Sequence, residues 1–102
     1  MRKADNVSLD KISEMLSSLK PEARQRFRAE IKGVFGSYVR GEQKPGSDLD
    51  VLVEFEEGAN LLDLTGLADF LEEKLNLKVD VVPESALRDE LKGIVLREKV
   101  AV

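Results

Sequence analysis

Two aspartates, Asp48 and Asp50, stand at the start of an apolar segment, and their spacing suggests metal-dependent chemistry. Residues 49–55, LDVLVEF, are rich in β-branched and aromatic residues, which predicts a β-strand. Side chains alternate along a strand, so both aspartates point to the same face, with their Cα atoms about 7 Å apart. Carboxylate oxygens are the ligands that Mg²⁺ prefers, and paired metal ions lie about 3.5–4 Å apart. The pair therefore predicts a site for hard cations.

A third acid, Asp80, interrupts the apolar segment 77–83, LKVDVVP. A lone charge inside an apolar strand is rarely there for packing. If this strand neighbours the strand 49–55, Asp80 joins the other two carboxylates. Three carboxylates around two Mg²⁺ ions are typical of phosphoryl or nucleotidyl transfer. Because the chain has no histidine, Asp80 is the best candidate to take the proton from an attacking hydroxyl.

A Gly-Ser pair, Gly36 and Ser37, precedes Asp48 by ten intervening residues. Glycine lets the backbone approach a ligand closely, and the serine hydroxyl with the following N–H groups can hold phosphate oxygens. Arg40 and Lys44 add positive charge to the same loop. The GxxxxGK[ST] phosphate-binding loop does not occur in the sequence.

Each of these features, taken alone, also has a purely structural interpretation. Asp48 follows Pro-Gly-Ser and could be a turn residue. Asp80 could be a strand-edge charge that discourages aggregation. Gly36 and Ser37 could form an ordinary turn. Only the combination favours a catalytic site.

The remaining chain must supply the elements that position these residues, and apolar spacing predicts them. We expect helices over residues 8–19, 21–32, 61–75 and 84–100, and strands over 33–37, 49–55 and 77–83. Ser8 and Asn60 are expected to be N-caps. A loop over residues 38–48, with room for one helical turn, links the Gly-Ser pair to the acids.

Length and composition limit the classes of protein to which the chain can belong. At 102 residues we expect one domain, 1–102, with N-terminal helices in 1–32 and a catalytic core in 33–102. Residues 41–102 hold seven basic and fifteen acidic residues, so a nucleic-acid partner is not expected. No apolar run is long enough to span a membrane, no signal peptide is evident, and cysteine is absent. A cytoplasmic location is expected.

The segment GSYVRGEQKPGSDLDVLV (36–53) resembles the signature of the polymerase β-type nucleotidyltransferases: Gly-Ser, ten residues, Asp-x-Asp. GSYVRG, PGSDLDVLVEF and the later KVDVVP are similar to the minimal nucleotidyltransferase branch of that superfamily. The resemblance extends from about Gly33 to Val102. It implies an α+β fold in which helices flank a small mixed β-sheet.

The resemblance also implies a role for each site residue. The implied catalytic and metal-binding residues are Asp48, Asp50 and Asp80, holding two Mg²⁺ ions, and the implied nucleotide-binding residues are Gly36, Ser37 and Arg40. The implied substrate is a nucleoside triphosphate, ATP, whose α-phosphate is attacked while pyrophosphate leaves. In the family, the Gly-Ser pair holds the β- and γ-phosphates.

Proteins of this branch are commonly paired with a HEPN-domain toxin, and this resemblance implies an antitoxin. The implied reaction moves AMP from ATP to a tyrosine of the HEPN protein. One alternative is an antitoxin or nucleotide-binding module that acts by protein contact alone. Another is nucleotidyl transfer to a small molecule, which the absence of an added substrate domain makes the weakest hypothesis.

Overall fold

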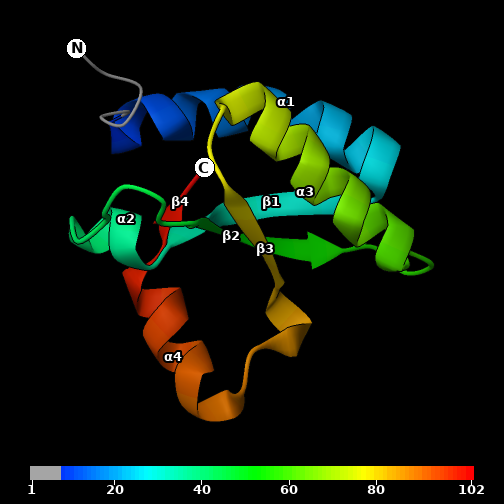
Figure 1. Ribbon diagram of the computed structural model, residues 1–102. Coiled ribbons are helices and arrows are strands. Elements are labelled where there is room, and N and C mark those ends of the chain that lie inside the picture. Colours follow the sequence, from blue (N-terminus) through cyan, green and yellow to red (C-terminus); the bar gives the residue numbers. More distant parts are fainter. Residues whose placement is uncertain (1–7) are drawn as a thin grey trace.

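The computed structural model describes residues 8–102, so residues 1–7 of the predicted domain lie outside the description. The elements follow in the order α1 (Leu9–Phe27), β1 (Ala29–Phe35), α2 (Ser37–Arg40), β2 (Leu49–Phe55), α3 (Leu61–Leu75), β3 (Val79–Pro83), the 3₁₀ turn η2 (Glu84–Ala86), α4 (Asp89–Glu98) and β4 (Val100–Ala101). Figure 1 shows α1 and α3 side by side on one face of the sheet, with α4 on the other side. No described helix is long and apolar enough to cross a membrane.

The four strands form a mixed sheet in the order β3-β2-β1-β4. β1 runs antiparallel to β2 and to β4, whereas β2 and β3 are parallel. Two parallel strands need a crossover connection. Helix α3 forms this connection, because it follows β2 and precedes β3 in the chain and packs against β3. The expected α+β fold, a small mixed sheet flanked by helices, is confirmed.

One face of the sheet builds the core. Leu49, Val51 and Val53 of β2 are fully buried in a cluster with apolar residues of α1 and α3, among them Leu16 and Leu71. Because side chains alternate along β2, the residues between these three point to the opposite face. Core packing therefore fixes which side of the sheet Asp50 faces.

Strand β2 and helix α3 have the boundaries that the sequence predicts. Asn60 caps α3: its side chain accepts hydrogen bonds from the N–H groups of Leu62 and Asp63, and Asp63 accepts one from the N–H of Asn60. Ser8 caps α1, as expected, by accepting a hydrogen bond from the N–H of Lys11. Local capping and periodicity were sufficient for these boundaries, including the start of α1.

The prediction of two N-terminal helices, ending at residue 32, is wrong. A single helix α1 continues through Pro21 to Phe27, and Arg28 ends it in the left-handed conformation. Burial of Leu16 and Ala23 on the same side of α1 holds the helix together across the proline, which removes only one backbone hydrogen bond. Residues 29–32 belong to β1, where burial alternates along AEIK as in a strand.

The prediction of one helix over residues 84–100 is also wrong. The segment divides into η2, the ten-residue helix α4 and the short strand β4. Strand β4 pairs with β1, with Ala101 opposite Gly33 and Val100 opposite Val34. A Cβ atom on Gly33 would meet the backbone of Val100, so glycine is what lets β4 come this close. This pairing returns the end of α4 to the Gly-Ser turn.

Candidate active site

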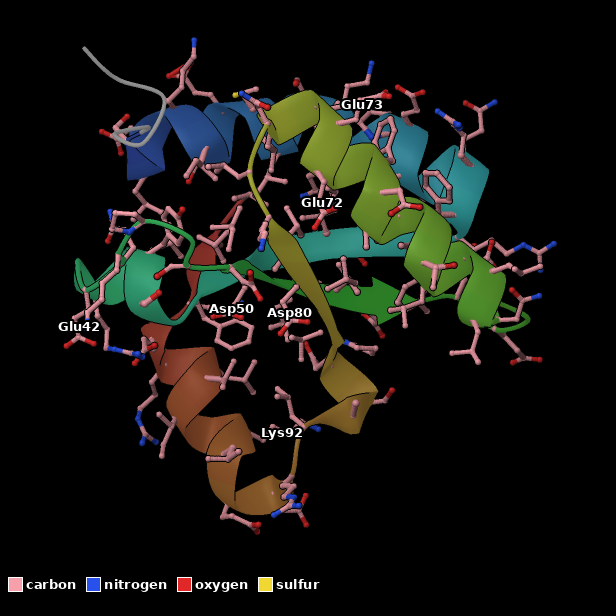
Figure 2. The ribbon with its side chains drawn as sticks, in the orientation of Figure 1. Glu42, Asp50, Glu72, Glu73, Asp80 and Lys92 are labelled. Carbon is pink, nitrogen blue, oxygen red and sulfur yellow. The ribbon has the colours of Figure 1, made fainter. Side chains whose placement is uncertain are left out.

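The parallel pairing of β2 and β3 brings two of the predicted acids together. Asp50 lies directly opposite Asp80 in the register, and neighbouring strands are about 4.8 Å apart. Figure 2 shows both side chains on the side of the sheet away from α1 and α3. Asp50 is partly buried, whereas Asp80 and Asp48, which comes just before β2, are exposed. The condition set by the sequence, that the two strands be neighbours, is met.

Within the described part of the chain, the three carboxylates make no direct contact that would neutralise their charge. Across residues 8–102, no hydrogen bond or ion pair joins the side-chain carboxylate of Asp48, Asp50 or Asp80 to any other group. Burial, then the charges of Asp80 and Asp48, raise the pKa of Asp50 to about 6, although the charge of Arg40 acts in the opposite direction. A cation bound between these carboxylates would offset their mutual repulsion.

The described part of the chain holds no ready-made group of three acidic side chains close enough to enclose a metal ion. Mg²⁺ is usually held by one or two carboxylates together with substrate phosphates rather than by an all-protein cage. The paired Asp50 and Asp80, with Asp48 close enough for its charge to raise the pKa of Asp50, are therefore a donor set that suits Mg²⁺ accompanied by a phosphorylated ligand.

The Gly-Ser turn lies against Asp50. Phe35, the last residue of β1, is opposite Asp50 in the register, so the chain leaves β1 beside the site. Gly36 follows with φ 85° and ψ −152°, a conformation that is essentially restricted to glycine. A Cβ atom at Gly36 would overlap the Asp50 carboxylate. Ser37 then begins the single helical turn α2, which the sequence allowed for.

Arg40, the last residue of α2, is held by two glutamates. Its Nε donates to Glu42 Oε1 at 2.8 Å, and its Nη1 donates to Glu98 Oε1 at 2.9 Å. The same Glu98 oxygen accepts a hydrogen bond from the N–H of Gly36 at 3.1 Å. Sequence reasoning missed Glu98, because no local pattern links two residues that lie 62 positions apart.

A cleft of about 300 Å³ opens beside the loop that carries Asp48. Its lining includes Lys44, Ser47 and Lys78, with Tyr38 and Leu77 among the less polar residues. Ser47 directly precedes Asp48, and Lys78 lies two residues before Asp80. The cleft thus contains two lysines, including the Lys44 that the sequence singled out for positive charge, whereas none of the three acids lines it.

The pKa of Asp50 predicts how stability depends on pH. The folded state binds this proton more tightly than the unfolded state, whose carboxyl has an ordinary pKa of 3.8. The contribution of Asp50 to stability is therefore lost as the pH rises from about 4 to about 6. Without divalent cations, the free energy of unfolding of Asp50→Asn should exceed that of wild type increasingly over this interval, by on the order of 1 kcal/mol after solvent screening.

Urea denaturation of both proteins across this pH interval measures the effect. Other carboxylates titrate in both proteins, so only the difference between the two curves reports on Asp50. A difference that stays constant with pH would mean that the fold does not perturb the Asp50 carboxyl.

Several known proteins resemble this chain over most of its length. A family model described as a nucleotidyltransferase domain matches residues 9–102. Protein adenylyltransferase MntA of Thermococcus cleftensis is 47% identical over 96 residues, covering 94% of this chain and 97% of that relative. A solved structure described as a candidate minimal nucleotidyltransferase is 39% identical with a TM-score of 0.73, covering 95% of this chain and 98% of that chain. Another, described as a toxin-antitoxin with AMP-PNP, has a similar fold, with 24% identity and a TM-score of 0.65 over 93% of this chain and 72% of that chain.

Proposed function

The chain belongs to the nucleotidyltransferase domain family, and from this premise we propose that it moves AMP from ATP to a hydroxyl of a partner protein. The resemblance to a minimal nucleotidyltransferase is confirmed by a solved relative that matches nearly the whole chain. Transfer to a protein is supported by the Thermococcus cleftensis relative, which is named as a protein adenylyltransferase. The observation that carries the proposal is the pairing of Asp50 with Asp80 beside Gly36, with no ion pair to either carboxylate among the described residues.

Mg²⁺ fits the donor set of this site. Asp50 and Asp80 would hold it with Asp48, and we propose two ions, as the family resemblance implies. When bound, Mg²⁺ would supply positive charge for the phosphate oxygens and for the attacking oxygen. Its charge would also offset the burial and the repulsion from Asp80 and Asp48 that together raise the pKa of Asp50.

The reaction proposed for these residues is an in-line displacement at the α-phosphate. The acceptor oxygen forms a bond to the α-phosphorus. The bond from that phosphorus to the oxygen that bridges it to the β-phosphorus breaks, so pyrophosphate leaves. Asp80 is exposed and opposite Asp50, and it is proposed to take the proton of the acceptor hydroxyl. Ser37 and the neighbouring backbone N–H groups are proposed to hold the β- and γ-phosphates.

The acceptor is proposed to be a tyrosine of a HEPN-type toxin, which the transfer would silence. Asp48 and Asp80 are exposed, and the acidic face of the sheet lies opposite the face that α1 and α3 cover (Figure 2). An arrangement of this kind suits an acceptor that a second protein presents. A cytoplasmic location, where ATP is available, is part of the same proposal.

Labelled ATP provides the direct test. We expect label from [α-³²P]ATP to reach the HEPN-domain protein encoded nearest to this chain when Mg²⁺ is present. Addition of EDTA should stop transfer, and so should the double variant Asp48→Ala/Asp50→Ala, because both remove the metal site. Gel autoradiography and mass spectrometry of the acceptor measure the outcome.

Two results would contradict the proposal. Absence of label on the partner would exclude this acceptor, and undiminished labelling by the double variant would exclude these acids as the site. The alternative, neutralisation by contact alone, makes a different prediction for co-expression. If the double variant protects cells from the toxin as well as wild type does, contact suffices.

A further inference from the structure

Glu98, at the end of α4, connects the two ends of the Gly-Ser turn. A single carboxylate oxygen, Oε1, accepts the hydrogen bond of the Gly36 N–H and that of Arg40 Nη1. The Glu98 side chain is 24% exposed, so these bonds are partly shielded from water. Gly36 precedes α2 and Arg40 ends it, so Glu98 spans the whole turn that carries Ser37.

The turn needs such support. Helix α2 has four residues, far fewer than an isolated helix requires for stability. Its own backbone bonds are few: Val39 and Arg40 donate to the carbonyl of Gly36, and Gly41 and Glu42 donate to that of Ser37. Tyr38 and Val39 also pack against the core, and the charge-assisted contact from Glu98 ties the two ends of the turn together.

The position of Glu98 is itself fixed by the strand that follows it. Lys99 closes α4 by donating to the carbonyl of Val95, and Val100 then pairs with β1. Beyond β4, the N–H of Val102 donates to the carbonyl of Lys32. The strand that ends in the Gly-Ser turn thus also holds the segment that carries Glu98.

We propose that Glu98 is a positioning residue, which holds the turn from Gly36 to Arg40 so that Ser37 is presented to the phosphates of the nucleotide. This inference rests on the proposed function, because it assigns Glu98 a part in nucleotide binding. In a competing role, the Glu98 carboxylate would occupy the position of a nucleotide phosphate and would have to move away before the nucleotide could bind. The two roles predict opposite changes in affinity when Glu98 is removed.

Nucleotide binding separates the two roles. With Mg²⁺ and adenosine 5′-(α,β-methylene)triphosphate, which cannot transfer AMP, we expect Glu98→Ala to weaken binding about tenfold, as for the loss of one charge-assisted hydrogen bond. Glu98→Gln should lie between this variant and wild type, because its amide oxygen can still accept from Gly36. In the transfer reaction, the KM for ATP should rise about tenfold while kcat falls less than about threefold.

Hydrogen exchange tests, without any nucleotide, whether Glu98 stabilises the turn from Gly36 to Arg40. In Glu98→Ala, the amides of Val39, Arg40 and Glu42 should exchange faster than in wild type, because they form the backbone bonds of the turn. Glu90→Gln is the matched control, since it removes a carboxylate from the exposed side of the same helix. It should change neither the affinity nor the exchange.

Each outcome decides one question. Equal or tighter nucleotide binding by Glu98→Ala overturns the positioning role, and so does unchanged exchange in the turn. If wild type itself binds no nucleotide, the proposed function fails. In that case, faster exchange in Glu98→Ala would still show that Glu98 stabilises the turn.

Discussion

Replacement of Asp50 by Asn should lower kcat/KM for nucleotidyl transfer by about 1,000-fold or more while leaving the protein folded. Asn has the shape of Asp but lacks its charge, and Asp50 is the acid that lies opposite Asp80 and against Gly36. A loss of about 4 kcal/mol of transition-state stabilisation, a reasonable amount for a disabled metal site, corresponds to this factor. Release of pyrophosphate, followed with a coupled assay, measures the rate.

Glu54→Gln is the control for this variant. Glu54 lies on the same strand and on the same face as Asp50, and it pairs at 3.5 Å with Lys32 rather than with the acids. Its loss should leave the rate within about twofold of wild type, since an exposed ion pair contributes little. Asp50→Asn should also melt at the same or a higher temperature at pH 7. Retention of more than about a tenth of the wild-type rate would mean that Asp50 does not hold the metal.

Gly36→Ala should nearly abolish nucleotide transfer and lower the free energy of unfolding by about 2–4 kcal/mol. Two separate effects add here. The backbone of Gly36, with φ 85° and ψ −152°, is strained for any residue with a Cβ atom. The new methyl group would also overlap the Asp50 carboxylate and displace it from the site. Urea denaturation and the pyrophosphate assay measure the two consequences.

Gly41→Ala separates strain from overlap. Gly41 also has a positive φ, 72°, but a Cβ atom there would meet nothing within 4 Å. This variant should lose about 1–2 kcal/mol of stability through strain alone and keep most of its activity. If Gly36→Ala were as active and as stable as Gly41→Ala, close packing of the turn against Asp50 would not be required for the reaction.

The acids and the elements that carry them could be predicted because their signals are local. The alternation of β2 places Asp50 opposite to the core, and the cap at Asn60 sets the start of α3. From the sequence, Asp50 and Asp80 were expected to be adjacent only if their two strands were neighbours. The parallel register of β2 and β3 shows that they are.

The errors arose where tertiary contacts override local signals. Pro21 is a helix breaker in isolation, yet burial of α1 against the sheet carries the helix past it. Strand β4 has only two residues and no pattern of its own, since Val100 and Ala101 become a strand only by pairing with β1. Glu98 was missed for the same reason, because its role depends on where β4 brings it.

The pairing of β4 with β1 has a consequence for the order of folding. Strands β1 and β2 are consecutive and antiparallel, so they bring the Gly-Ser turn beside Asp50 with a comparatively short loop. Strand β4 lies near the end of the sequence, so its pairing with β1 closes a loop that contains β2, α3, β3 and α4. Closing this longer loop costs more conformational entropy than closing the loop between β1 and β2. We therefore expect the acids and the turn to assemble early, and Glu98 to reach Gly36 as one of the last steps, when the end of the chain completes the sheet.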